Sequence, residues 1–258
     1  MASHFFHNPS FFSPPSPAIL PPKMKYKRIM LKISGEALAG DHGFGVDHKI
    51  LQKISKRICA VAKKDIEIAV VIGGGNIWRY RDTKESGIER TSSDAMGMLA
   101  TVMNAVALQS ALETQGCYTR VLSAVDIPQL AEPYIRRRAV RHLEKGRIVI
   151  CAGGTGNPYF TTDSAAALRA LELDCDILLK GTNVKGVYDK DPRKSKNAKL
   201  YSELTYQQAI EQHLNVMDQA AFSLCADADL PIRVFDFNNE SNLLKAASGE
   251  KIGTLVHR

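Results

Sequence analysis

Hydrophobic positions along this chain form short apolar runs, separated by longer segments in which they recur every three or four residues. The runs are nearly continuous and rich in β-branched residues, which is typical of strands buried on both faces of a parallel sheet. We therefore predict strands at 28–33, 66–72, 118–124, 147–152, 176–180, 232–235 and 254–256. The intervening segments predict helices at 46–62, 132–144, 206–213, 218–228 and 240–247, with two more starting near Asp94 and Asp163. Because strands and helices alternate, the sheet should be mainly parallel and covered by helices on both faces.

Two of the predicted helices begin with a cluster of capping residues. The segment Thr91-Ser92-Ser93-Asp94 precedes a long apolar helix and is, on its own, typical of an N-cap. The segment Thr161-Thr162-Asp163-Ser164 precedes an alanine-rich helix and follows a glycine loop. Backbone N–H groups at a helix start also bind anions, so the second cluster is either a structural cap or part of a ligand site.

Glycine-rich loops follow two of the predicted strands. The loop Gly73-Gly74-Gly75 holds more glycines than one turn needs, so we expect its backbone N–H groups to approach a ligand. Arg79 follows closely, and its guanidinium group suits a phosphate. The second loop spans 153–160. Since ligands of open α/β sheets gather beyond the carboxyl ends of the strands, we expect both loops at one site.

Two predicted strands end in lysine. Lys32 precedes a turn at Ser34 and Gly35, and Lys180 precedes Gly181. A lysine in this place is either solvated or in contact with an anion, and its occurrence on two strands favours the anion. The polar loop after Lys180 carries Tyr188, which is able to stack on a base, and closes at the turn Asp191-Pro192.

Composition and charge add limits to this interpretation. The chain has 258 residues, of which 45% are hydrophobic and 24% charged, as in ordinary globular proteins of one large domain or two small ones. No apolar run approaches the roughly 18 residues of a membrane span. The net charge of +7 suits polyanions, but the basic residues are spread along the chain. Their main cluster, Arg136-Arg137-Arg138 with Arg141, is either a solvated helix face or a contact for RNA or an effector.

The five cysteines are odd in number, widely spaced and without a Cys-x-x-Cys pair. They predict buried free thiols in a reducing compartment, not a disulfide framework or a zinc site. The histidines show no metal-ligand spacing, so we predict no metal site made by the protein alone.

Residues 1–23 have no acidic residue and hold six of the eleven prolines, a composition that does not suit a packed core. They are either an organelle-targeting leader or an upstream extension of a chain that starts at Met24. We therefore predict one domain over 24–258 and a cytoplasmic location, unless residues 1–23 direct the chain to a plastid or another organelle.

The candidate residues indicate phosphoryl transfer. The chain contains no P-loop motif, no Gly-x-Gly-x-x-Gly and no protein kinase signature. Phosphoryl transfer chiefly requires charge neutralisation, which two lysines, glycine N–H groups and Mg²⁺ supply. A carboxylate at Asp163 between two ammonium groups would hold them in place and favour their charged forms.

Several motifs, in order along the chain, closely resemble those of the bacterial-type uridylate (UMP) kinases, the nucleotide branch of the amino-acid kinase superfamily. They occupy residues 32–37, 71–76, 96–104, 154–166 and 231–235. The resemblance runs from about residue 26 to the C-terminus. It implies a three-layer α/β/α sandwich with a mainly parallel central sheet. It also implies that ATP and UMP, with Mg²⁺, are converted to ADP and UDP, usually by a homohexamer.

The same resemblance implies roles for individual residues. Lys32 and Lys180 would stabilise the transferred phosphoryl group, and Asp163 would organise them. The ATP side would comprise Lys32, Ser34, Gly35, Gly75, Arg79, Thr182, Tyr188 and Asp191. The UMP side would comprise Gly74, Asp94 at the ribose hydroxyls, Thr155, Gly156, Asn157, Pro158, Tyr159, Phe160, Thr161 and Thr162.

The chain departs from the family pattern at two places. The usual Gly-Asp-His-Met-Gly is Ser93-Asp94-Ala95-Met96-Gly97 here, which keeps the ribose ligand but changes two neighbours and with them, we expect, the affinity for UMP. The bacterial enzymes are often inhibited by UTP and activated by GTP. Gln109 and Glu113 stand where some relatives carry basic residues, and an acidic side chain would repel a triphosphate. This argues against GTP activation, although Arg120 and Arg147 remain.

Two alternatives stay open from the sequence. One is another amino-acid kinase that acts on a carboxylate or carbamate. The other is a regulatory or RNA-binding protein, suggested by the basic balance and by the arginine cluster at 136–141, although a nucleic-acid partner is the weaker interpretation.

Overall fold

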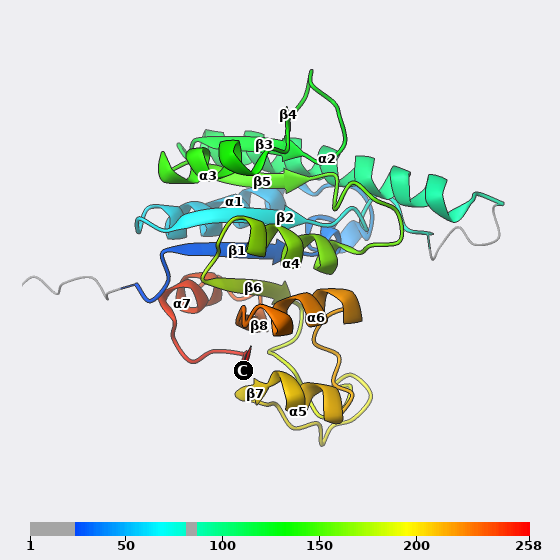
Figure 1. Ribbon diagram of the computed structural model, residues 1–258, viewed down its shortest axis with the longest axis vertical. Helices are drawn as coiled ribbons and strands as arrows, with labels where there is room; N and C mark the ends of the chain where they lie inside the picture. Colours follow the sequence, from blue (N-terminus) through cyan, green and yellow to red (C-terminus); the bar gives the residue numbers. More distant parts are fainter. Residues whose placement is uncertain (1–23, 81–86) are drawn as a thin grey trace, which may run out of the picture.

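The computed structural model describes residues 24–80 and 87–258, so the predicted leader lies outside the described residues. A nine-stranded sheet forms the centre, in the order β4-β3-β5-β2-β1-β6-β8-β9-β7 (Figure 1). Its strands are β1 (Arg28–Ile33), β2 (Glu67–Ile72), β3 (Thr119–Ser123), β4 (Glu132–Pro133), β5 (Ile148–Ala152), β6 (Ile177–Thr182), β7 (Glu203–Thr205), β8 (Ile232–Asp236) and β9 (Thr254–His257). Among these pairs only β8 and β9 run antiparallel, so the predicted mainly parallel sheet is confirmed.

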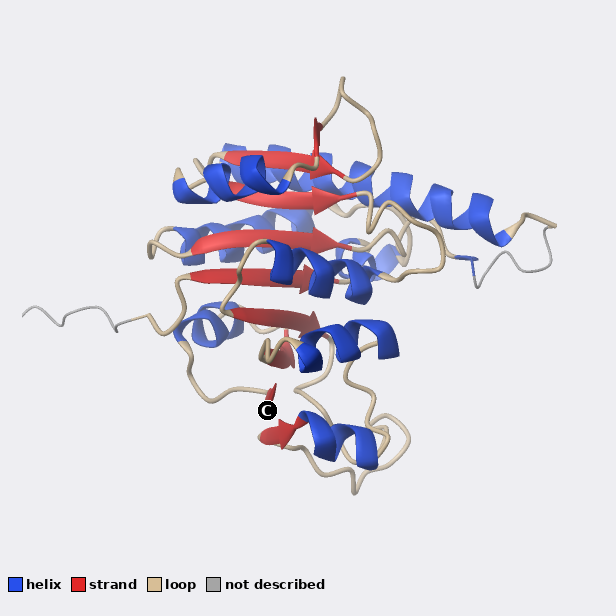
Figure 2. Ribbon diagram, viewed as in Figure 1, coloured by secondary structure: helices blue, strands red, loops and turns tan. Residues whose placement is uncertain are grey.

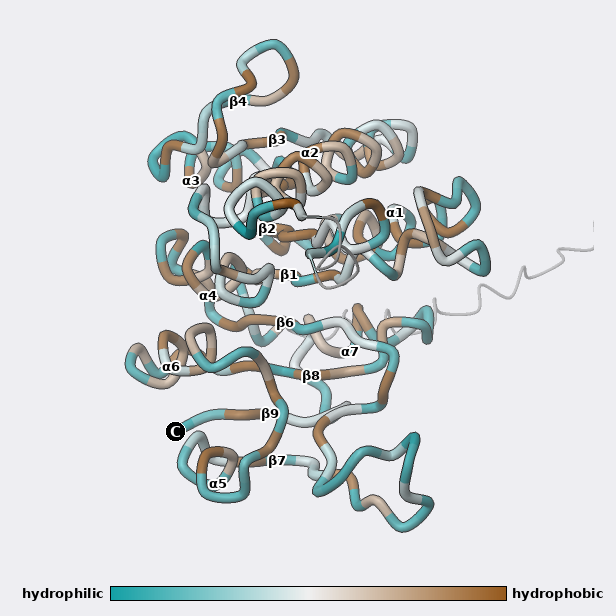
Figure 3. The backbone as a smooth tube through the Cα atoms, turned by 90° about the vertical axis from the view of Figure 1, so that its right-hand side faces the viewer, coloured by the Kyte–Doolittle hydropathy of each residue, from teal (hydrophilic) through white to brown (hydrophobic). Residues whose placement is uncertain are grey.

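Helices cover both faces of this sheet (Figure 2). The helices are α1 (His48–Ala62), α2 (Arg90–Thr114), α3 (Arg136–Glu144), α4 (Thr162–Glu172), α5 (Tyr206–Glu211), α6 (Gln219–Asp227) and α7 (Asn242–Ser248). One hydrophobic cluster joins the sheet to α1, α2 and α7, and a second joins it to α3, α4, α5 and α6. Figure 3 looks onto the carboxyl ends of the strands and shows the two helix layers on either side of the sheet. The expected three-layer α/β/α sandwich is therefore confirmed.

The continuous apolar runs explain why the central strands have no exposed face. In β1, Ile29, Leu31 and Ile33 contribute to the first cluster, whereas Met30 faces the second. Every residue of β5 is buried. A strand with both faces covered has to be apolar at successive positions, which is the pattern that predicted these elements.

The structure corrects the predicted start of α2. This helix begins at Arg90 with Glu89 as its N-cap residue, so the segment 91–94 lies inside the helix and does not cap it. Asp94 is therefore free to use its carboxylate elsewhere: it accepts from Arg90 Nε at 2.7 Å and from the backbone N–H of Tyr159 at 2.8 Å. Asp94, a residue type common at helix N-caps, therefore makes a long-range contact with Tyr159.

Among the described helices, α2 alone is long and apolar enough to cross a membrane by length and composition. Its residues Val102, Ala105, Leu108 and Leu112 are buried in the cluster that packs on the sheet. This packing identifies α2 as a core helix of the domain.

The cysteine prediction is wrong for one pair. Cys59 of α1 and Cys117, just before β3, form a disulfide across 58 residues of sequence. Cys151, Cys175 and Cys225 are free and buried, as predicted. Burial raises the pKa of the Cys151 and Cys225 thiols to about 12, so both stay protonated at neutral pH. The sequence contained no spacing signal for the pair because α1 and α2 bring the two residues together only in the folded chain.

Candidate active site

The two predicted lysines stand side by side at the carboxyl end of the sheet. Strands β1 and β6 are parallel neighbours, and their register places Lys32 directly beside Lys180. Paired residues of neighbouring strands point to the same face of a sheet. Both side chains are largely buried, with 12% of the Lys32 side chain and 15% of the Lys180 side chain exposed.

Asp163 lies between the two ammonium groups. Its Oδ1 is 2.8 Å from Lys32 Nζ, and its Oδ2 is 2.7 Å from Lys180 Nζ. Burial by itself would raise the pKa of this carboxyl, but the two lysines outweigh that effect and hold the pKa of Asp163 below its usual value. The carboxylate therefore stays ionised and cannot serve as a proton donor at neutral pH.

Burial has the opposite consequence for Lys180. Loss of hydration lowers the pKa of its ammonium group, Asp163 opposes that shift, and Lys32 adds to it. Lys180 Nζ also donates to the carbonyl oxygen of Val216 at 2.7 Å. These two partners fix the direction in which the ammonium group points.

Helix α4 places Asp163 through its N-terminal capping. The hydroxyl oxygen of Thr161 accepts from the backbone N–H groups of Asp163 and Ser164, at 3.0 and 3.4 Å. A carboxylate in the first turn is also favoured by the partial positive charge of the helix start. The segment 161–164 is therefore a helix cap and a functional segment at once.

Asp218 ties this helix start to the next helix, and sequence reasoning did not single it out. Its carboxylate accepts from the hydroxyl groups of Thr161 and Ser164 and from the backbone N–H of Ala221 as the N-cap of α6. The only available signal was its position at the predicted start of a helix at 218.

The turn at Gly35 and the loop at Gly74 leave no room for a side chain. A Cβ atom on Gly35 would lie 2.4 Å from the carbonyl oxygen of Gly73, and one on Gly74 would lie 2.7 Å from that of Gly97. Real Cβ atoms do not approach other atoms so closely. The Gly35 turn, the loop 73–75 and α2 therefore pack backbone against backbone at this edge. These glycines are thus required for packing as well as for access to a ligand.

A buried pair of amides holds this loop region together, and sequence reasoning missed it. Asn104 Nδ2 donates to the Gly73 carbonyl oxygen and to Asn76 Oδ1, both at 2.7 Å. Asn76 Nδ2 donates to the carbonyl oxygen of Gly45 at 2.6 Å and to Asn104 Oδ1 at 3.1 Å. The side chains of both residues are fully buried, so the network anchors the glycine loop to α2.

A cavity of about 330 Å³ brings together most of the residues predicted for UMP. Its lining includes Gly74, Asp94, Thr155, Asn157, Phe160, Thr161 and Thr162. Among the described residues, Gly156, Pro158 and Tyr159 do not line it. Tyr159 has a positive φ of 71° and contributes its backbone N–H to Asp94 instead of facing the cavity.

Arg79 lines the same cavity, beside Gly75. Its Nη2 is 2.7 Å from Glu36 Oε1, and its Nε donates to the carbonyl oxygen of Gly75. The Arg79 side chain is three-quarters buried. Its guanidinium group lines the cavity, while two of its nitrogens already contact Glu36 and Gly75.

A second cavity, of about 420 Å³, lies around the segment that follows β6. Thr182, Tyr188 and Asp191, which the resemblance assigns to the adenosine end of ATP, line it together, and His213, Leu214 and Asn215 also line it. The strand β6 extends two residues beyond the predicted end, so Thr182 lies at the strand terminus next to Lys180.

The two arginines of the predicted effector region both have partners within the chain, and for Arg120 these are carboxylates. Arg120 lies 3.8 Å from Glu113 and 3.8 Å from Glu132, and Arg147 Nη1 lies 3.0 Å from His142 Nδ1. In the arginine cluster, Arg136 contacts Asp174 and Arg141 contacts Glu144, whereas Arg137 and Arg138 are exposed.

The chain is similar to known proteins over nearly its whole length. The sequence profile of the amino acid kinase family matches residues 27–236. A UMP kinase from Bacillus anthracis is 40% identical, with a TM-score of 0.88 over 90% of this chain and 96% of that one. A UMP kinase from Ureaplasma parvum is 36% identical, with a TM-score of 0.86 over 91% of this chain and 100% of that one. The uridylate kinase from Archaeoglobus fulgidus is 28% identical, with a TM-score of 0.70 over 88% and 99%. With its fold, its paired lysines and these relatives, the chain belongs to the amino acid kinase family.

Proposed function

We propose that this protein is a UMP kinase, which transfers the γ-phosphoryl group of ATP to UMP. The observation that carries the proposal is the ion-paired cluster of Lys32, Asp163 and Lys180. Thr162, next to Asp163, lines one cavity, and Thr182, two residues after Lys180, lines another. One cavity contains the residues that resemble a UMP site, and the other contains those that resemble an adenosine site. In this proposal the phosphoryl group passes from one cavity to the other close to the two ammonium groups.

In this mechanism an oxygen of the UMP phosphate attacks the γ-phosphorus of ATP. The bond from that phosphorus to the β–γ bridging oxygen breaks, and ADP leaves with the electron pair. Lys32 and Lys180 neutralise charge on the moving group, and Asp163 keeps the two cations at a fixed separation. No protein side chain has to accept a proton, because the attacking phosphate is already ionised at neutral pH.

Mg²⁺ would accompany the nucleotide. Over the described ranges 24–80 and 87–258, no three His, Cys, Asp or Glu side chains gather at metal-binding distance. Mg²⁺ commonly keeps several waters and binds through phosphate oxygens, so the phosphates of ATP are its natural ligands here. The ion would add positive charge beside the two lysines.

A panel of acceptors tests the substrate. With ATP and Mg²⁺, we expect ADP release with UMP and slower release with dUMP, because dUMP lacks one of the ribose hydroxyls proposed to contact Asp94 in the acceptor cavity. ADP release with glutamate, aspartate or carbamate but not with UMP would replace the proposal by another amino acid kinase activity. RNA binding without UMP-dependent ATP consumption would favour the regulatory alternative.

We also propose that the protein assembles as a homohexamer. The proposal is supported by an apolar face on α2, where Met96, Leu99 and Met103 are 38%, 50% and 61% exposed. Their spacing of three and four residues places them on one side of the helix. Exposed apolar patches of this kind commonly mark interfaces.

For regulation, we propose inhibition by UTP and no activation by GTP. The second part is supported by Glu113, which lies 3.8 Å from Arg120 and offsets the positive charge that Arg120 would offer to a triphosphate. A fall in the rate with UTP and an unchanged rate with GTP are the expected results.

A further inference from the structure

Arg90 lies in the first turn of α2 and lines the cavity proposed for UMP, although no sequence motif pointed to it. Its Nε is 2.7 Å from Oδ2 of Asp94, four residues further along the helix. Its guanidinium carbon lies 4.5 Å from the centre of the Tyr80 ring and 5.5 Å from the centre of the Tyr159 ring. A guanidinium group at these distances is attracted by the π-electrons of the rings. Arg90 therefore connects the start of α2 to two other segments of the cavity wall.

The contacts of Asp94 distinguish its two carboxylate oxygens. Oδ2 accepts from Arg90 Nε and from the backbone N–H of Tyr159, at 2.7 and 2.8 Å. Within residues 24–80 and 87–258, Oδ1 makes no hydrogen bond or ion pair with the protein. The Asp94 side chain is 15% exposed, so it has little freedom once Oδ2 is held. Oδ1 is therefore available to a hydroxyl group in the cavity, and its orientation depends on Arg90.

Helix α2 also holds both ends of the glycine loop that follows β5. At the first end, the backbone N–H of Gly153 donates to Thr101 Oγ1 at 2.8 Å. At the other end, Tyr159 has a φ of 71°, which is unfavourable for a residue with a Cβ atom and persists only where neighbouring groups fix it. The contacts of Tyr159 with Asp94 and Arg90 fix it here. Several residues between the two ends line the cavity, so its shape depends on both anchors.

We propose that Arg90 is a positioning residue of the acceptor site. It acts through Asp94 and Tyr159: it keeps Oδ1 of Asp94 available to a ribose hydroxyl group, and it holds the end of the glycine loop in place. Arg90 thereby contributes to the preference for a ribonucleotide over a deoxyribonucleotide, and not to the transfer of the phosphoryl group. The choice of UMP as the ligand rests on the proposed function, whereas the contacts of Arg90 do not.

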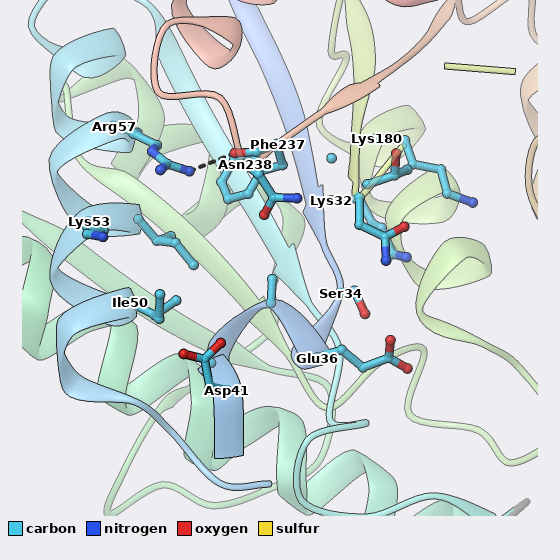
Figure 4. A pocket seen from close by; sticks show the side chains of 16 residues that line it. Lys32, Ser34, Glu36, Asp41, Ile50, Lys53, Arg57, Lys180, Phe237 and Asn238 are labelled. Atoms are coloured by element: carbon cyan, nitrogen blue, oxygen red, sulfur yellow. Dashed lines mark hydrogen bonds between the residues drawn. The ribbon is translucent and has the colours of Figure 1, made fainter. Parts of the chain in front are cut away.

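The donor side lies apart from these contacts. Lys32 and Lys180 line a separate recess of about 430 Å³, together with Ser34 and Thr182, which the resemblance assigns to ATP (Figure 4). This recess shares no residue with the cavity that Arg90 lines. We therefore expect a substitution of Arg90 to leave the KM for ATP unchanged.

The preference for UMP over dUMP tests the role of Arg90. We expect Arg90→Met to raise the KM for UMP about tenfold and the KM for dUMP about twofold, because a poorly oriented carboxylate loses most of its hydrogen bond to the ribose. The ratio of the two kcat/KM values should thus fall about fivefold at an unchanged kcat. Arg258→Met is the control: Arg258 also contacts an aspartate at 2.8 Å, but it is 85% exposed and lines neither the cavity nor the recess.

A wild-type ratio of the two acceptors in Arg90→Met would overturn the proposal. An equal fall in kcat for both acceptors, with unchanged KM values, would also overturn it, since that result is expected of a merely structural residue. If Arg90→Met does not fold, Arg90→Lys takes its place, because it keeps the charge but lacks the planar guanidinium group. Its ratio should fall as well, and a wild-type ratio in Arg90→Lys would count equally against the proposal.

Amide hydrogen exchange separates this proposal from the proposed function. We expect the backbone N–H of Tyr159 to exchange faster in Arg90→Met than in wild type, whereas that of Gly153, which donates to Thr101, should exchange at the same rate. Equal exchange at Tyr159 in the two proteins would overturn the role of Arg90. A wild-type protein without UMP-dependent ADP release would refute the proposed function and leave the exchange measurement valid.

Discussion

Each carboxylate oxygen of Asp163 faces one ammonium group, Lys32 on one side and Lys180 on the other. Removing one partner from a buried ionic cluster leaves charge without compensation in a poorly hydrated place. The arrangement therefore depends on all three residues. The two ammonium groups can act together on a phosphoryl group only while the Asp163 carboxylate reduces their mutual repulsion.

Replacing Asp163 by asparagine tests this dependence. The amide has the same shape but no charge, so the two ammonium groups would repel each other and lose their orientation. We expect kcat with UMP to fall by roughly 100- to 1000-fold, as for the loss of other preorganised electrostatic groups. Asp227→Asn, an exposed residue at the end of α6, is the matched control. Equal kcat values for the two variants would contradict the assigned role.

The pH dependence of kcat/KM tests Lys180. Because burial lowers the pKa of its ammonium group below the ordinary 10.5, the folded protein loses this proton at a pH where a free lysine would keep it. We therefore expect kcat/KM to fall on the basic side at a pH below 10.5. Lys180→Arg should keep reduced activity but lose that fall, since a guanidinium stays protonated. A fall in kcat/KM that is caused by the substrates would persist in Lys180→Arg. If wild type and Lys180→Arg showed the same fall at high pH, the fall could not be assigned to Lys180.

The residues that the sequence reveals are those with a local signal. A lysine at the end of an apolar run and an aspartate in a cap after a glycine loop are visible without a structure. Asn104 has no such signal, because an asparagine in an apolar helix reveals its partners only after the helix has packed on the glycine loop. Asp218 was visible as a helix start but not as the partner of Thr161 and Ser164.

At the scale of elements, hydrophobic spacing predicted the long strands and most helices to within a few residues. It did not predict β4 and β7, which have two and three residues and are too short for a periodic pattern. It also placed the start of α2 one turn late, because capping residue types occur inside the helix, where they contact neighbouring segments.

The packing of α2 on the glycine loop leads to a stability prediction. Replacing Asn104 by alanine would leave the Gly73 carbonyl oxygen and the Asn76 amide buried without these partners. We expect the free energy of unfolding in urea to fall by about 2–3 kcal/mol. Ser110→Ala, an exposed position on the same helix, should change it by less than about 0.5 kcal/mol. A loss for Asn104→Ala as small as that of the control would show that the amide pair does not anchor the loop.

At the scale of the whole molecule, α2 has an exposed apolar face that no other part of the described chain covers. The sheet and its two helix layers bury the other apolar stripes, whereas Leu99 and Met103 remain open to solvent. The helix lies at the end of the sheet opposite to α5 (Figure 1). Other residues of α2, among them Gly97, Met98 and Thr101, line the cavity proposed for UMP, so an interface through Leu99 and Met103 would not use them.

Charge placed on this face should separate the subunits. For the double variant Leu99→Glu and Met103→Glu, we expect the mass from size-exclusion chromatography with light scattering to fall from that of an oligomer to a smaller species. Burying two unpaired carboxylates in an apolar contact is strongly unfavourable. Ile210→Glu, at an equally exposed apolar position on α5, is the control. Equal masses for the double variant and the control would exclude this face as an interface.

The most direct test of the central claim follows the phosphoryl group itself. Wild-type protein with γ-labelled ATP, Mg²⁺ and UMP should yield labelled UDP in a single turnover. Lys180→Met should slow this transfer by about 100-fold or more, whereas Lys185→Met, an exposed lysine in the loop after β6, should leave it unchanged. Labelled UDP formed equally fast by Lys180→Met and wild type, or no labelled UDP from wild type, would contradict the account.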